Sequence, residues 1–174
     1  MEVLSELFST LLYTFEHLGV LAYWLIFLIA LADSLIIVGT FTNGLIFLLL
    51  AGALISRGVY DLGDMTLFAA TGAVLGGCAS YYLGLLVNKS FISKRRFPKE
   101  KHLSQGADLL EQYEGAGILI GRFLGPLSSI VTFAAGVADM PLKQFLLWNV
   151  LSGLLWATVF IFAGTFIGDY IFHW

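Results

Sequence analysis

The segment 117–136, GILIGRFLGPLSSIVTFAAG, is apolar over almost its whole length but contains an arginine, Arg122, and a proline, Pro126. A charge at bilayer depth costs about 2.5–3.5 kcal/mol on insertion scales, so it is retained where it is paired or functional. Gly125 and Pro126 interrupt a helix, and interrupted backbone at that depth must lie within protein or beside a water-filled cavity. The stretch therefore predicts a re-entrant hairpin at 116–140 that places a cation inside a membrane.

The composition of the whole chain is that of an integral membrane protein. Of its 174 residues, 59% are hydrophobic and 12% are charged, whereas a soluble domain carries about 25% charged residues. The apolar segments 64–87 and 142–170 are each longer than the ~20 residues that a spanning helix needs. Residues 1–16 combine acidic side chains with helically spaced apolar ones, which predicts an interfacial amphipathic helix rather than a signal peptide.

The apolar run from Leu18 to Gly58 is too long for a single membrane helix. Its centre contains Gly39 and the turn-forming pair Asn43-Gly44. We therefore predict a spanning helix at 18–34, followed by a re-entrant hairpin at 35–58 that breaks near this centre.

The polar segment 88–115 predicts the orientation of the protein. Six of the nine basic residues lie between Lys89 and Lys101, and the positive-inside rule then makes this loop cytoplasmic. The basic cluster can be explained by membrane topology alone, and contact with anionic lipid headgroups is the alternative explanation. Leu103, Ala107 and later apolar residues predict an interfacial helix in the second part of the loop.

The two halves of the chain share an order of features. Each has a break, an Ala-Gly pair (Ala51-Gly52, Ala135-Gly136) and a polar turn. A long apolar helix follows, which contains a further pair that ends in glycine (Leu83-Gly84, Ala163-Gly164). The cytoplasmic loop separates the halves, so the two units are expected to be upside down relative to each other. We predict an all-α membrane fold of two inverted repeats, each a re-entrant hairpin followed by a spanning helix, as in secondary transporters.

Polar residues at the two predicted breaks form the candidate substrate site. A guanidinium binds phosphate or carboxylate bidentately, and half-helix N-termini attract anions. Asp33 has two interpretations: a cap at the level of the headgroups, together with Ser34, or a functional group that acts as a proton carrier or as the partner of Arg122. The polar residues at the breaks could equally satisfy only the interrupted backbone. The candidate substrate-binding residues are Arg122, Asp33, Thr42, Asn43, Ser128 and Ser129, with Asp33 also assigned to proton coupling, and the breaks are Gly39, Gly44, Gly125 and Pro126.

Other chemistry has little support in the sequence. No GxSxG, HExxH or Walker motif is present, and the three histidines are scattered, so we do not expect an enzyme. Cys78 has no second cysteine and no metal-ligand pattern around it, so no metal or other cofactor is expected. Tyr81, Tyr82 and Asn149 are expected to form hydrogen bonds between helices. Membrane lipids and protons are the expected partners; no nucleic acid is expected, and a homo-oligomer is compatible with the sequence.

The segment GRFLGPLSSIVTFAAGVADMPLKQFLLWNVLSGLLWATVFIFAGTFIG resembles the DedA family, also known as SNARE-associated Golgi or VTT-domain proteins. The family order there is Gly-Arg-Phe, Gly-Pro, a second arginine, Ala-Gly, Met-Pro or similar, then Phe, Asn and Trp. ADSLIIVGTFTNGLIFLLLAGALISRG and GAVLGGCASYYLG resemble the first half of the family pattern in part. The resemblance covers about residues 30–168 and implies a lipid transporter or scramblase with two opposed re-entrant hairpins.

The chain departs from the family pattern at three positions. Ser128 stands where a second arginine is usual, Gly77 where an aspartate is usual, and Asn43 where a proline is usual. A site with one arginine lacks a second bidentate fork and grips phosphate more weakly. The departures allow a different headgroup, such as a zwitterionic one, or a degenerate member.

The function that the resemblance implies is transport of a phosphate-bearing lipid, undecaprenyl phosphate or a phospholipid, across the bacterial inner membrane, with proton coupling. Two alternatives stay open. One is a proton-coupled transporter of a small solute or ion, and the other is a non-transporting membrane scaffold.

Overall fold

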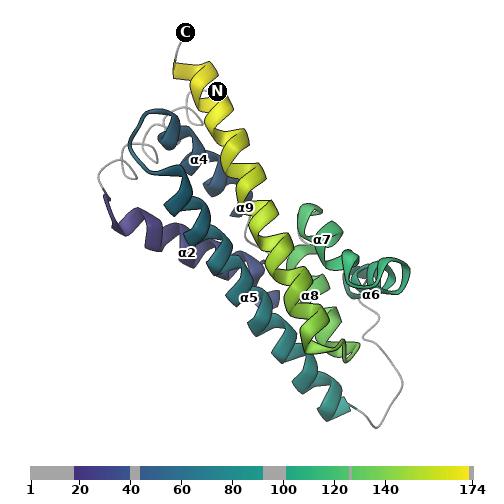
Figure 1. The fold of residues 1–174 in the computed structure, drawn as a ribbon. Helices are drawn as coiled ribbons and strands as arrows, with labels where there is room; N and C mark the ends of the chain where they lie inside the picture. The colour runs from purple at the N-terminus through teal and green to yellow at the C-terminus, as the bar shows by residue number, and fades with distance from the viewer. Residues whose placement is uncertain (1–17, 40–43, 92–100, 126, 173–174) are drawn as a thin grey trace.

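A computed structural model describes residues 18–39, 44–91, 101–125 and 127–172, and its regular elements there are helices (Figure 1). The all-α prediction is therefore confirmed for this part of the chain, while the predicted amphipathic helix at 1–16 lies outside it. The helices are α2 (Leu21–Ser34), α3 (Ile36–Gly39), α4 (Gly44–Ser56), α5 (Leu62–Phe91), α6 (Lys101–Tyr113), α7 (Ala116–Phe123), α8 (Leu127–Val137) and α9 (Leu142–Phe172).

Two helices of the described chain, α5 and α9, are long and apolar enough to cross a membrane, over Leu62–Val87 and Leu142–Tyr170. The predicted spanning segment 18–34 corresponds to α2, which has 14 residues and belongs with α4 and α8 among the shorter apolar helices. At a rise of 1.5 Å per residue, 14 residues cover about 21 Å, less than the ~30 Å of a bilayer core.

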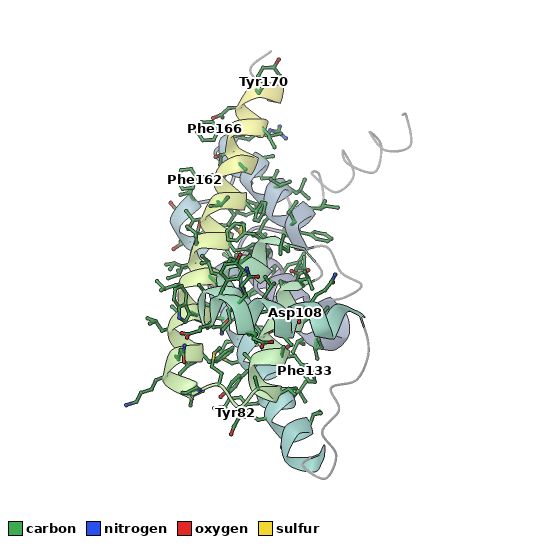
Figure 2. All side chains as sticks on the ribbon, turned by 90° about the vertical axis from the view of Figure 1, so that its right-hand side faces the viewer. Tyr82, Asp108, Phe133, Phe162, Phe166 and Tyr170 are labelled. Atoms are coloured by element: carbon green, nitrogen blue, oxygen red, sulfur yellow. The ribbon has the colours of Figure 1, made fainter. Side chains whose placement is uncertain are left out.

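The outer surface of α9 is apolar. Figure 2 shows Phe162 and Phe166 projecting from one side of this helix and Tyr170 near its end, and the three side chains are 43%, 73% and 71% exposed. A soluble monomer rarely exposes a large continuous apolar surface, so this face is suited to lipid.

Two of the short helices, α4 and α8, pack on the long helix of the opposite half of the chain, whereas α2 packs on α5 of its own half. α4 lies against α9 and α8 lies against α5, at opposite ends of the pair of long helices (Figure 1). Glycine meets glycine at both contacts: a Cβ on Gly52 would lie 2.8 Å from the Cα of Gly164, and one on Gly84 would lie 3.0 Å from the Cα of Gly136. Small residues let helix backbones approach closely, so these glycines fix both crossings.

The predicted loop 88–115 contains the last turn of α5 and the whole of α6. α6 packs on α7 and α8, and a Cβ on its Gly106 would lie 3.0 Å from the Cγ2 of Ile130. The helix expected in the second part of this loop therefore lies against the bundle, with Leu110 buried and Tyr113 45% exposed.

Two apolar clusters surround a layer of buried polar residues. One cluster joins α2, α4, α5 and α9, and the other joins α5, α6, α7, α8 and α9. Along α9 the buried Asn149 and Ser152 lie between Phe145 of the second cluster and Trp156 of the first. The other buried polar side chains are Asp33, Ser34, Ser80, Arg122, Ser128, Ser129 and Thr132. The fold thus concentrates polar groups where the short helices from the two halves meet.

Candidate functional site

Two interruptions of helical backbone frame the polar layer. α7 ends at Phe123, and Gly125 has a φ of 62°, a left-handed conformation that glycine adopts at little cost. α2 ends at Ser34, and Leu35 is extended with a ψ of 129°. The interrupted backbone at Leu35 is satisfied by Ser80 of α5, whose hydroxyl accepts from the Ile36 N–H and donates to the Ser34 carbonyl.

Arg122 extends from the last turn of α7 into the space between α5 and α9. Its side chain is 3% exposed, and its Nη2 donates a hydrogen bond of 2.5 Å to the Oδ1 of Asn149. A Cβ on Gly153 would lie at an ordinary contact distance of 3.6 Å from Nη1, so Gly153 of α9 borders the guanidinium. Within the described residues Nε has no hydrogen-bond partner, which is costly for a buried charged donor.

Asn149 connects Arg122 to α5. Its Nδ2 donates to the Val74 carbonyl at 3.0 Å and approaches the Sγ of Cys78 at 3.5 Å. Val74 lies at the midpoint of the apolar window Leu62–Val87. If α5 crosses a bilayer, the guanidinium is therefore held near the middle of the membrane.

Asp33 lies at the end of α2 and is buried. Its Oδ1 accepts the backbone N–H of Gly44, the first residue of α4, at 2.9 Å. The carboxylate therefore occupies the positive end of a half-helix. It also interacts electrostatically with the guanidinium of Arg122. Of the two interpretations of Asp33, the structure supports a cap, but of α4, and it supports proximity to Arg122.

The serines of α8 are both buried, and they differ in their surroundings. Ser129 is fully buried, and its Oγ has no hydrogen-bond partner among the described residues. A Cβ on Gly39 would lie 3.0 Å from the Cβ of Ser129, so α3 and α8 touch at this point. Ser128 is 8% exposed, and the hydroxyl of Thr132 bonds to carbonyls of its own helix.

The structure thus places Asp33 within electrostatic range of Arg122, and it places Ser129 and the backbone of Asp33 on either side of Gly39. The predicted site residues Thr42 and Asn43 and the predicted break residue Pro126 lie outside the described residues. Gly39 is the last residue of α3 and Gly44 the first residue of α4, and Gly125 lies between α7 and α8.

Asn149 is the residue that sequence reasoning undervalued. It was expected to bond between helices, which it does, but its contact with Arg122 was not expected. An amide in the apolar helix 142–170 was the available signal. Tyr81 also bonds as expected, donating to the Met140 carbonyl at 2.6 Å, whereas Tyr82 is 52% exposed.

The arrangement has the chemistry of an oxyanion site. Within the described residues, a buried guanidinium whose Nε–H has no acceptor lies in a polar layer that also contains a buried hydroxyl without a partner. A phosphate oxygen accepts hydrogen bonds from both kinds of donor. The nearby Asp33 limits how much negative charge the site attracts.

Comparison with known proteins gives one family and several membrane proteins. The profile of the VTT domain matches residues 42–166. Protein DedA of Escherichia coli is 29% identical over 154 residues, covering 86% of this chain and 70% of that protein. Inner membrane protein YabI of Escherichia coli is 30% identical over 148 residues, covering 81% of this chain and 56% of YabI.

An uncharacterized membrane protein of Buchnera aphidicola is 29% identical over 142 residues. The match covers 81% of this chain and 56% of that relative, so the chain corresponds to little more than half of it. No solved structure matches the chain significantly.

Proposed function

Since this chain belongs to the VTT-domain, or DedA, family of membrane proteins, we propose that it moves a phosphate-bearing lipid across a bacterial inner membrane. Undecaprenyl phosphate or a phospholipid is the substrate that the sequence resemblance implies. Protons are the proposed driving ion, with Asp33 as their carrier.

The observation that carries the proposal is the buried guanidinium of Arg122. It is 3% exposed, its Nη2 binds a neutral amide, and its Nε lacks a partner in the described chain. An arginine in such surroundings is expensive unless it serves function. A phosphate headgroup would supply the missing acceptors, and a guanidinium suits it because of its planar fork of donors.

The membrane arrangement that fits this site has two inverted repeats. We propose that α2, α3 and α4 enter and leave through one face, while α7 and α8 enter and leave through the other. The lengths of these helices, the opposite ends at which α4 and α8 pack, and the contact of Gly39 with Ser129 support this arrangement. With the basic segment on the inside, residues 88–115 are cytoplasmic.

The proposed route keeps the acyl chains in the bilayer while the headgroup passes between the hairpins. Arg122 receives the phosphate near the level of Val74, the middle of the apolar window of α5. Binding near the midplane where two broken helices meet is the general scheme of secondary transporters.

Flipping of fluorescent lipids by the purified chain in liposomes tests the proposal. A short-chain fluorescent phosphatidylglycerol is the probe, and a glycosyl lipid with the same chains and no phosphate is its control. We expect Arg122→Ala to abolish flipping of the phospholipid at normal expression. Arg122→Lys should retain a small part of it, because a lysine offers a point charge without the fork. Lys143→Ala, which removes an exposed cation at the start of α9, is the matched control.

The same liposomes separate the alternatives. Uptake of a water-soluble anion such as inorganic phosphate, unaffected by added phospholipid, would favour the solute transporter. Wild-type protein that moves neither probe would favour the scaffold. Full flipping by Arg122→Ala would remove the proposed role of this residue.

A further inference from the structure

We propose that Asn149 is a positioning residue that orients the guanidinium of Arg122 for binding an anion. We further propose that residue 77 is a glycine because a larger residue would occupy the space of the Asn149 amide. The inference rests on the proposed function and adds two residues to that site. It is carried by the contacts of one side chain that joins α7, α5 and α9.

The orientation of the Asn149 amide is dictated by its neighbours. Nδ2 faces the Val74 carbonyl at 3.0 Å, which can only accept, and Oδ1 faces Arg122, which can only donate. Turning the amide over would place donor against donor and acceptor against acceptor. The backbone of α5 therefore fixes the acceptor that Arg122 meets.

Gly77 makes room for this amide. A Cβ at residue 77 would lie 2.5 Å from the Oδ1 of Asn149 and 3.1 Å from both its Cγ and its Nδ2. Even an alanine would therefore force the amide out of its present position. The pair Gly77–Asn149 thus works as one unit, with one residue on each long helix.

A neutral partner has a specific consequence for ligand binding. The amide oxygen fixes Nη2 without cancelling the positive charge, and Nε stays without a partner in the described residues. A carboxylate in the same place would form an ion pair and compete with the ligand for the guanidinium. Asn149 therefore orients Arg122 while leaving its charge to the phosphate.

The test compares Asn149→Ala, Asn149→Asp, Gly77→Ala and the control Ser152→Ala. Ser152 is buried one turn along α9, and among the described residues its hydroxyl bonds only the Asn149 carbonyl of its own helix. Two readouts are needed: the initial flipping rate against mole fraction of fluorescent phosphatidylglycerol, and thermal stabilisation of the detergent-solubilised chain by soluble dihexanoyl phosphatidylglycerol.

Asn149→Ala should weaken the apparent affinity in both readouts about tenfold, the effect of losing one hydrogen bond to a charged group, with a smaller change in maximal rate. Gly77→Ala should act in the same direction although Arg122 and Asn149 are intact. Ser152→Ala should match the wild type.

Asn149→Asp separates positioning from simple hydrogen-bond satisfaction. If residue 149 served only to accept a hydrogen bond from Arg122, the aspartate variant would keep more affinity than the alanine variant. We expect the reverse for affinity near neutral pH, and recovery of affinity at low pH as the new carboxyl group is protonated. Asp33 and Cys78, the titratable groups that act on Arg122, are common to all these variants.

The two readouts keep the two proposals apart. Wild-type affinity in Asn149→Ala, or pH-independent wild-type affinity in Asn149→Asp, would overturn the positioning role. If the wild type binds the soluble phospholipid but flips none, transport fails, and the binding data still decide the role of Asn149. If the wild type does not bind it, both proposals fail.

Discussion

The Oγ of Ser80 on α5 lies 2.9 Å from the backbone nitrogen of Ile36 and accepts its N–H, just after the end of α2. The same hydroxyl donates to the Ser34 carbonyl at 2.8 Å. Leu35 between them is extended. A side chain of a long helix thereby stabilises the break that places Asp33 at the start of α4.

Ser80→Ala should destabilise the protein. The Ile36 N–H and the Ser34 carbonyl would each lose the hydrogen bond to Ser80, and a buried polar group that loses its bond costs about 1–3 kcal/mol. We expect a clear drop in the thermal unfolding midpoint of the protein in detergent, and partial rescue by Ser80→Thr, which keeps the hydroxyl. Thr71→Ala is the control because Thr71 is exposed and its hydroxyl bonds only the Leu67 carbonyl within the described part of the chain. Equal midpoints for the two alanine variants would contradict the role of Ser80.

This break marks the limit of what sequence reasoning could find. The long helices α5 and α9 follow from the length of their apolar segments, and the break at Gly125 follows from a glycine and a proline. The stop at Ser34 has no such signal, because Leu35 is a good helix former. A tertiary hydrogen bond compensates for the interrupted helix, and the pattern of a single segment does not contain it.

The charged residues of the candidate site could be predicted from the sequence, but the contacts between them and their neighbours could not. Arg122 and Asp33 stand out because charges are rare in apolar segments, and the structure places them within electrostatic range. The contact of Arg122 with Asn149 depends on how α7 meets α9. Gly115, at the start of α7, lies against the ring of Trp148 on α9, and helical periodicity alone does not give such a contact between helices.

The two glycine crossings should be energetically similar. A Cβ on Gly52 would clash with the Ile161 carbonyl, and one on Gly136 would clash with the Tyr81 carbonyl. We expect Gly52→Ala and Gly136→Ala each to destabilise by about 1–3 kcal/mol, the usual cost of overpacking. Thermal unfolding in detergent measures both. Gly63→Ala is the control, because its Cβ would meet only the Asp61 Oδ1, at 3.2 Å. If Gly52→Ala or Gly136→Ala left the unfolding midpoint unchanged, the two helix crossings would not be equivalent.

Cys78, the one cysteine of the chain, should report whether the polar layer is wet. Its Sγ lies 3.5 Å from the Asn149 Nδ2, beside the Arg122 site. Charged methanethiosulfonate reagents need water to reach it. We expect an anionic reagent to label the protein in intact membranes faster than a cationic one, because Arg122 attracts anions.

The preference in this labelling experiment should vanish in Arg122→Ala. Cys78→Ser gives the background, and protein unfolded in detergent gives full labelling. Soluble dihexanoyl phosphatidylglycerol should slow the reaction by occupying the site. Thiols that stay unlabelled in membranes, yet react fully after unfolding, would mean that water does not reach the polar layer.

Asp33→Asn should separate proton coupling from the fold. The amide oxygen of asparagine can still accept the Gly44 N–H, which Asp33 accepts at 2.9 Å, so the start of α4 is kept. The substitution removes the group that could carry a proton beside Arg122. We expect lipid flipping in liposomes to persist in this variant and its stimulation by an imposed pH difference to disappear.

Asp33→Ala should lose stability as well, because the Gly44 N–H then lacks that acceptor. Asp64→Asn, in the exposed first turn of α5, is the matched control and should respond to the pH difference as the wild type does. Undiminished stimulation in Asp33→Asn would assign the proton to another group and leave Asp33 with the capping of α4, because that contact does not depend on a titrating carboxylate.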